Sequence, residues 1–155
     1  MEININDFKI DIASARKEIY TSPGSNPKVA NSTIKEDLKR RDFTINSIAF
    51  EVSTRKIYDL YEGISDIKGK KLNLLHVNSI SDDPSRLIRC AKYASRFNFN
   101  ISNNSLQQSQ ETVRQWPWKS SETHKKITFP PAIGIRIRME PVSYTHLTLP
   151  TILRV

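Results

Sequence analysis

Closely spaced charged side chains occupy residues 37–46, which read Asp-Leu-Lys-Arg-Arg-Asp-Phe-Thr-Ile-Asn. Guanidinium groups bind phosphate oxygens through charge-assisted hydrogen bonds, and a carboxylate beside them can accept a hydrogen bond from a ribose hydroxyl. Arg41, Asp42 and Asn46 are therefore candidates for binding a nucleotide. The alternative is that the segment is a solvated helix end with an ordinary Arg–Asp ion pair.

A second polar group lies within residues 82–96. Asp83, Arg86, Arg89 and Lys92 are spaced three residues apart, so a helix would place them along one face, opposite its apolar side. A carboxylate accepts from the exocyclic amine of a base and an arginine donates to ring acceptors, so Asp83 and Arg86 could read a base edge. The structural alternative is a helix cap at Asp83 followed by surface pairs.

Two further polar segments are interpreted as structural. Residues 59–67 predict a strand end that turns at Gly63 into a helix capped by Ser65 or Asp66. The other segment flanks a loop and comprises Arg16, Lys17, Glu18 and Tyr20. Its side chains could touch RNA or nucleotide, but we interpret them as solvated.

The elements that must position these groups are predicted from apolar patterning and turn residues. Apolar and polar residues alternate over residues 8–13, which predicts a half-buried strand with Asp11 pointing away from the core. Turn-forming residues at 21–27 predict a loop. A capping box at residues 33–36 predicts a helix start, and residues 50–60 predict a hairpin.

The longest predicted helix runs from Pro84 to about Phe97, with Asp83 as its cap. Its buried face is predicted from an apolar stripe made by Leu87, Ile88, Ala91 and Ala94. Neither helical nor strand periodicity is sustained beyond Gln107, so residues 108–155 predict irregular chain. Residues 141–150 also resemble the translation of a sequencing adapter.

Composition excludes several classes of protein. The 155 residues contain 24 Lys and Arg against 16 Asp and Glu, a net charge of +8, which fits a polyanionic partner such as RNA. Cys90 is the only cysteine, so neither an intramolecular disulfide nor a cysteine zinc cluster can form. Charged residues interrupt the first segment and no apolar run reaches about 18 residues, so we expect a soluble, cytoplasmic protein with no membrane segment.

Taken in order, these motifs resemble those of the bacterial class II tRNA nucleotidyltransferases and poly(A) polymerases. The resemblance covers residues 8–106 and rests on DIASARKEIYTSPGSNPKV, STIKEDLKRRDFTINSIAF, IYDLYEGISDIKGKKL and DDPSRLIRCAKYASRFNF. The block Arg-Arg-Asp-Phe-Thr-x-Asn, followed at this separation by Asp-Pro-x-Arg-x-x-Arg, makes the resemblance specific.

The resemblance implies a template-free polymerase that uses magnesium and adds C and A, from CTP and ATP, to the tRNA 3′ end. By the same resemblance, Arg41 would hold the triphosphate and Asp42 the sugar, with Asn46 supporting this block. Asp83 and Arg86 match the positions that select C or A by hydrogen bonding to the base edge.

Other positions extend the pattern or depart from it. Arg89 matches a further nucleotide-site arginine, whereas Lys92 stands where the family usually has Arg and therefore lacks the planar fork. Asp82 stands where the family usually has the longer Glu. The family's Gly-Gly phosphate loop and Asp-x-Asp metal pair do not occur here, and Asp11 is the only nearby acidic candidate for catalysis. We therefore expect little or no catalysis from this chain alone.

Together these patterns predict an α+β fold, a partial nucleotidyltransferase (polymerase β-like) mixed sheet with helices, followed by the start of an all-α neck. Residues 1–75 are expected to form the C-terminal part of the head domain and residues 76–107 the start of the helical, RNA-binding neck. Residues 108–155 would be an irregular tail of unrelated or artefactual origin. We interpret the chain as an internal piece of the enzyme.

Two alternatives stay open at this stage. The first is a non-catalytic nucleotide- or RNA-binding module that uses the basic surface without chemistry. The second lies within the enzyme class, because CCA-adding, A-adding and poly(A)-adding members share these motifs.

Overall fold

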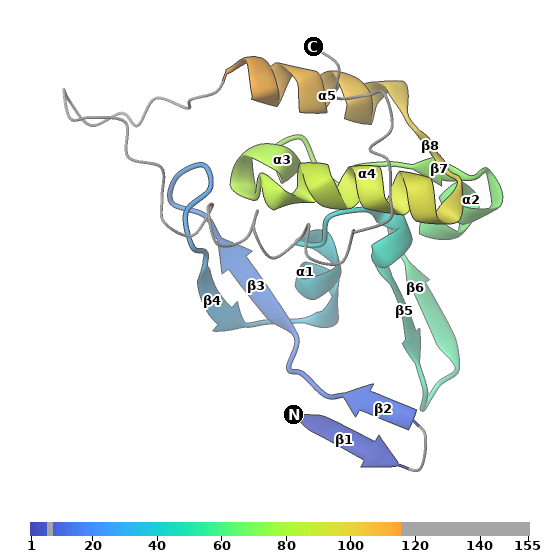
Figure 1. Ribbon diagram of the computed structural model, residues 1–155. Coiled ribbons are helices and arrows are strands. Elements are labelled where there is room, and N and C mark those ends of the chain that lie inside the picture. Colours follow the sequence, from blue (N-terminus) through green and yellow to red (C-terminus); the bar gives the residue numbers. More distant parts are fainter. Residues whose placement is uncertain (6–7, 116–155) are drawn as a thin grey trace.

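A computed structural model describes residues 1–5 and 8–115 (Figure 1). The strands are β1 (Glu2–Ile5), β2 (Phe8–Asp11), β3 (Arg16–Ile19), β4 (Lys28–Asn31), β5 (Ile48–Glu51), β6 (Lys56–Asp59), β7 (Lys71–Leu72) and β8 (Asn100–Ile101). The α-helices are α1 (Ile34–Lys39), α2 (Gly63–Lys68), α3 (Ser79–Asp82), α4 (Ser85–Phe97) and α5 (Asn103–Arg114). A 3-10 turn covers Thr44–Asn46.

The strands pair two by two, and the α+β class is confirmed. β1–β2, β3–β4 and β5–β6 are antiparallel hairpins, whereas β7 and β8 pair in parallel. In place of one continuous mixed sheet, the described residues therefore form four separate two-stranded sheets. The helix at residue 34, the hairpin near residues 50–60 and the long helix after Pro84 are confirmed.

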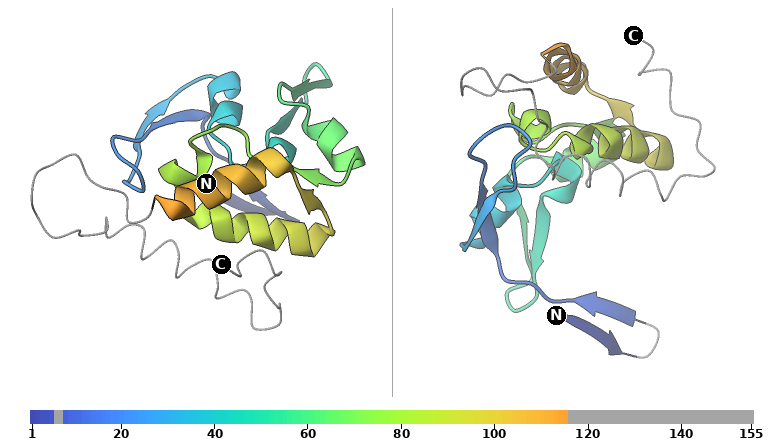
Figure 2. Two further views of the ribbon diagram at one scale, coloured as in Figure 1. Left: turned by 90° about the horizontal axis from the view of Figure 1, so that it is seen from above. Right: turned by 60° about the vertical axis from the view of Figure 1, so that its left-hand side comes forward.

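The first hairpin differs from its prediction. Ile10 and Ile12, expected on a buried face, are 43% and 48% exposed, and β2 ends at Asp11. The right-hand view of Figure 2 shows why, because β1 and β2 project away from the helices and no other described element covers them. Alternation correctly indicated a strand, but burial needs a covering partner.

Helix α5 corrects a second expectation. It begins after Ser102, whose hydroxyl accepts a hydrogen bond from the Ser105 N–H at 3.3 Å, and it runs through residues 108–114, which were predicted to be irregular. Its buried positions include Ser109 and Thr112, whose hydroxyls donate to carbonyl oxygens one turn earlier. Because these residues are polar, hydropathy does not show the helical period. The rest of the predicted tail, with the adapter-like stretch, lies outside the described residues.

Helix α2 is capped by a residue that the sequence analysis did not select. The Asp59 carboxylate accepts from the backbone N–H groups of Gly63 at 2.7 Å and Ile64 at 2.9 Å, so the predicted caps, Ser65 and Asp66, are wrong. Asp66 instead accepts from the Thr44 hydroxyl at 2.6 Å. A Cβ on Gly63 would overlap the Thr44 carbonyl oxygen, so this close approach requires glycine.

The core lies between the turn after α1 and helix α4. Phe43, Leu72, Cys90 and Ala94 form one buried cluster, and Phe43 meets the Tyr93 ring edge-on with centroids 5.5 Å apart. Burial raises the pKa of Cys90 to about 12, so this thiol packs as a small apolar group. The cluster fixes α4 beside the segment that follows α1 and so brings the two predicted polar motifs together.

Candidate functional site

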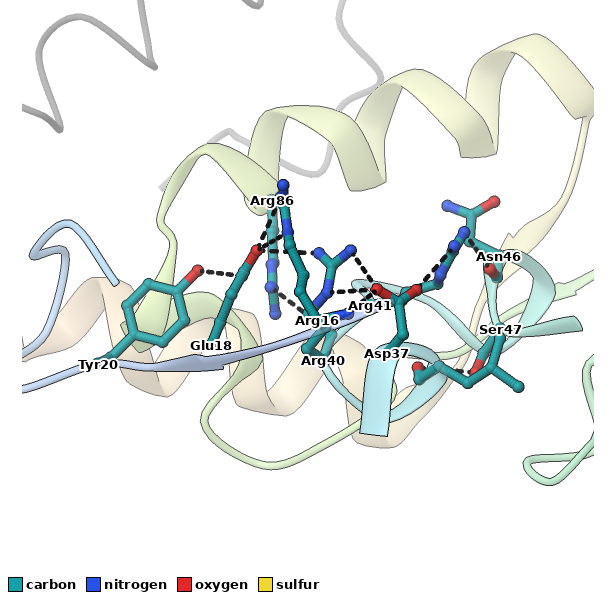
Figure 3. A network of polar contacts seen from close by, with 10 residues as sticks. Arg16, Glu18, Tyr20, Asp37, Arg40, Arg41, Asn46, Ser47 and Arg86 are labelled. Atoms are coloured by element: carbon teal, nitrogen blue, oxygen red, sulfur yellow. Dashed lines mark hydrogen bonds and ion pairs between the residues drawn. The ribbon is translucent and has the colours of Figure 1, made fainter. Parts of the chain in front are cut away.

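A cleft of about 710 Å³ lies where β3, the end of α1 and the first half of α4 meet. Its lining residues are Arg16, Glu18, Tyr20, Arg40, Arg41, Asp42, Asn46, Asp83, Ser85, Arg86, Arg89 and Tyr93. Figure 3 shows the polar network along it. Arginines outnumber carboxylates in this lining, so the cleft suits an anionic ligand.

Most of the candidate residues meet in this cleft. Those that line it are Arg41, Asp42, Asn46, Asp83, Arg86 and Arg89. Two do not: Lys92 is half-buried on α4, and Asp11 is exposed at the end of β2 on the projecting hairpin.

Asp42 joins the two motifs. One carboxylate oxygen accepts from the Phe43 backbone N–H at 3.0 Å and the Asn46 amide at 2.8 Å, and the other accepts from Arg89 Nε at 2.7 Å. Asp42 is only 7% exposed, so these bonds replace water around a buried charge. The Asp42–Arg89 pair joins residues 47 positions apart and is not predictable from local spacing.

Asp37, which was not a candidate, orients the two adjacent arginines. Its Oδ1 accepts from the Arg16 N–H at 3.1 Å and from Arg40 Nη2 at 2.8 Å, while Oδ2 accepts from Arg41 Nη2 at 3.1 Å. Burial raises the pKa of Asp37, but the hydrogen bonds from Arg40, Arg16 and Arg41 outweigh it and lower the pKa below its ordinary value. Asp37 is therefore a fixed anion beneath the guanidinium groups.

Glu18 extends this network across the cleft. Its carboxylate accepts from Arg40 Nη1 at 2.9 Å, from Arg16 Nη2 at 3.0 Å and from the Tyr20 hydroxyl at 3.2 Å. Burial and the Glu18 charge raise the pKa of Tyr20 to about 12. Interpreting Glu18 as solvated was wrong, because its side chain is only 8% exposed, whereas Arg16 and Lys17 are exposed as expected. The β3–β4 pairing that carries Glu18 has no clear alternation in the sequence.

Arg86 corrects the predicted orientation of helix α4. The residue was expected on the face opposite the apolar side, yet it is only 6% exposed. Its Nη2 donates to the Arg40 carbonyl at 2.9 Å and its Nη1 to the Ser79 hydroxyl at 3.0 Å. Arg86 is buried because α3 packs on this end of α4 and the carbonyl of Arg40, at the C-terminal end of α1, lies beside it.

The start of α4 is fixed as predicted, and its next turn adds an aromatic contact. Asp83 Oδ1 accepts from the Ser85 N–H at 3.1 Å, which makes Asp83 a cap. The Arg89 guanidinium lies 5.5 Å from the centre of the Tyr93 ring and donates to its hydroxyl at 3.3 Å. Burial raises the pKa of the neighbouring Asp82.

The described residues do not fit a two-metal site. Within residues 1–5 and 8–115, no three side chains of His, Cys, Asp and Glu lie close enough together to hold a metal ion. Asp11 has no place in the cleft lining, so the geometry does not connect it with the other candidates. The arrangement can bind and orient an anion.

Several cleft residues were not selected from the sequence, namely Arg16, Glu18, Tyr20, Arg40, Ser85 and Tyr93. Arg40 and Ser85 could have been selected, because they lie next to or near the candidates Arg41 and Asp83 in the sequence. In the described part of the chain no helix is both long and apolar enough to cross a bilayer.

Comparisons with known proteins identify relatives of this chain. The family model for the poly A polymerase head domain matches residues 1–73. The A-adding tRNA nucleotidyltransferase of Aquifex aeolicus is 41% identical over 103 residues, which are 64% of this chain and 12% of that relative. The chain thus spans about an eighth of that relative's length.

Solved structures are also similar. A CCA-adding enzyme (apo form II) is 37% identical with a TM-score of 0.66, over 69% of this chain and 26% of that one. A tRNA nucleotidyltransferase complexed with a primer tRNA and an incoming ATP analog is 32% identical with a TM-score of 0.63, over 73% of this chain and 31% of that one. The family is typically metal-dependent. Residues 1–73 thus belong to the poly A polymerase head-domain family, and about two thirds of the chain is similar to part of a tRNA nucleotidyltransferase.

Proposed function

We propose that this chain forms the nucleotide-binding part of a tRNA nucleotidyltransferase, which adds C and A from CTP and ATP to the tRNA 3′ end in the cytoplasm. The observation that carries the proposal is the meeting of two motifs, some 45 residues apart, in one arginine-rich cleft. Relatives that add A and structures that hold tRNA with an ATP analog support it.

The cleft supports specific roles. Arg41, whose side chain is 41% exposed, would bind the triphosphate. Asp37 and the Asn46 carbonyl fix its position by accepting from Nη2 and Nη1. Asp42 would accept a hydrogen bond from the sugar, with Asn46 and Arg89 holding the carboxylate. The Asp83 and Arg86 side chains would contact the base edge.

Magnesium belongs to the proposal for the complete enzyme. It would supply charge neutralisation at the transferring phosphate, and its carboxylate ligands would come from outside the described residues. On its own, the 155-residue chain is therefore expected to bind nucleotides without incorporating them. A non-catalytic binding module would show the same behaviour, and only incorporation by the complete protein separates the two.

The test is calorimetric titration of the chain with CTP, ATP and tripolyphosphate. Arg41→Ala is expected to weaken all three by tenfold or more, because a charge-assisted hydrogen bond contributes about 1.5–3 kcal/mol. Arg96→Ala, which removes an exposed arginine of α4 outside the cleft, is the matched control and should bind as the wild type does. Equal binding by both variants, or no binding by the wild type, would overturn the proposal.

A further inference from the structure

His76 lies in the turn between β7 and α3, where its half-buried imidazole meets the guanidinium of Arg86. The distance from His76 Nε2 to Arg86 Nη1 is 3.3 Å. An arginine can only donate, so Nε2 must be the unprotonated, accepting nitrogen, and the ring proton must be on Nδ1. This tautomer follows from the contact itself.

The contact completes a clamp around Arg86. Nη1 meets His76 and the Ser79 hydroxyl, while Nη2 donates to the carbonyl of Arg40. The guanidinium plane is therefore held at both ends, and its rotation about the side-chain axis is fixed. The imidazole accepts in its own ring plane, so it adds a directional constraint on the guanidinium to those from Ser79 and Arg40.

The turn that carries the imidazole is itself anchored. The His76 carbonyl accepts from the Ser79 N–H at 3.1 Å and from Gln108 Nε2 of α5 at 3.2 Å. His76 thus connects Arg86 with both α3 and α5. Burial and the positive charges of Arg86 and Lys39 lower the pKa of His76 to about 4, so the accepting, neutral ring persists at neutral pH.

We infer that His76 is a positioning residue that sets the tilt of the Arg86 guanidinium and thereby the preference of the cleft among nucleobases. The inference rests on the proposed function, in which Arg86 faces the base. A planar donor discriminates bases by direction, because the bases differ in where their acceptors lie. The phosphates are bound elsewhere, at Arg41, so a change of tilt alters base preference and leaves phosphate binding intact.

The experiment compares His76→Leu with His76→Gln. Leucine removes the acceptor at similar volume, whereas the glutamine amide oxygen restores an acceptor near the position of Nε2. The dissociation constants of ATP, CTP, GTP, UTP and tripolyphosphate are measured for the 155-residue chain. Val77→Ala, a change at the exposed neighbour in the same turn, is the matched control.

In His76→Leu, the preference for ATP and CTP over GTP and UTP is expected to fall about fivefold, an effect of losing one oriented hydrogen bond. Tripolyphosphate affinity should stay within about twofold, and His76→Gln and Val77→Ala should keep the wild-type preference. Uniform weakening of every ligand would indicate a merely structural role and overturn the inference, as would an unchanged preference in the leucine variant.

Failure of the proposed function gives a different result. If the wild type binds no nucleotide, both proposals fall, whereas nucleotide binding that depends on Arg41 but not on His76 overturns only the second. A measurement on the wild type does not depend on any variant folding. Long-range ¹H–¹⁵N correlations should show the Nδ1–H tautomer of His76, and the Nε2–H tautomer would overturn the inference because that nitrogen could not accept from Arg86.

Discussion

Asp42 is a buried carboxylate whose two oxygens both accept hydrogen bonds. Phe43 and Asn46 bind one oxygen and Arg89 the other, so a single residue stabilises both the turn after α1 and the position of α4. A carboxylate that accepts several hydrogen bonds stabilises the fold and also fixes the geometry of the cleft.

Asp42→Ala is expected to lower the free energy of unfolding by about 2 kcal/mol, because it leaves donors around a buried position without an acceptor. Urea denaturation followed by circular dichroism measures the loss. The matched control is Asp11→Ala, at an exposed position of β2, which should change stability by less than about 0.5 kcal/mol. Equal losses in both variants would contradict the role given to Asp42.

His76 makes stability depend on pH in a defined direction. Its pKa is about 4 in the folded chain and near its ordinary 6.5 when unfolded, so between these values the unfolded chain binds more protons. The free energy of unfolding should therefore fall as the pH is lowered from 7 to 5, by an amount on the order of 1 kcal/mol after solvent screening of this half-exposed group.

His76→Gln removes the titrating group and should flatten this part of the pH dependence. Denaturation midpoints at pH 5 and pH 7, compared between the two proteins, provide the measurement. The same slope in both would show that His76 does not carry the effect.

Among the elements, α2 depends on the close approach of its first residue to Thr44. Gly63→Ala is expected to cost about 2 kcal/mol or more, because its Cβ would overlap the Thr44 carbonyl oxygen, which is backbone and cannot turn aside. Gly69→Ala, at the other end of the same helix, places its Cβ 3.4 Å from the Ser65 carbonyl oxygen and should be neutral or slightly stabilising. The melting temperatures of both variants test this, and a similar loss in both would contradict the role given to Gly63.

Local signals in the sequence predicted some elements well. Thr33 and Asp83 predict the starts of α1 and α4, because a capping side chain binds backbone N–H groups only two or three residues away. The structure confirms both caps, which accept from the N–H groups of Glu36 and Ser85. Helix α5 was missed because its buried positions carry hydroxyl groups such as that of Ser109. Strands β3 and β4 were missed because apolar and polar residues do not alternate along them.

These local sequence signals did not predict how the elements pack against one another. Spacing put Arg86 and Arg89 on one helical face, and both reach the cleft, but which side of that face is buried depends on α1 and α3. Asp37 and Glu18 were not selected, because a charged residue is expected to be exposed to solvent unless its ion-pair partners are known. The role of each candidate residue in nucleotide binding stays a prediction.

At the scale of the whole molecule, the β5–β6 hairpin exposes apolar side chains. Phe50 and Ile57 are register partners and are 57% and 54% exposed. Adjacent apolar groups on a two-stranded ribbon favour association between chains. The double variant Phe50→Thr/Ile57→Thr should therefore shift the chain toward monomer at high concentration, with little loss of folding stability.

Sedimentation velocity over a range of concentrations measures this shift. Val77→Thr, at a valine that is 79% exposed and away from the hairpin, is the control and should sediment as the wild type does. Unchanged association of the double variant would show that the hairpin is not the surface responsible.

The two bonds that join the motifs, from Arg86 to the Arg40 carbonyl and from Arg89 to Asp42, each close a chain segment of 46 or 47 residues. Closing a long chain segment costs conformational entropy, and contacts within each motif do not offset this cost. During synthesis, the first motif leaves the ribosome well before α4 exists to meet it. The cleft is thus absent from any nascent chain that lacks α4, and nucleotides can be engaged only after this helix has been made and docked.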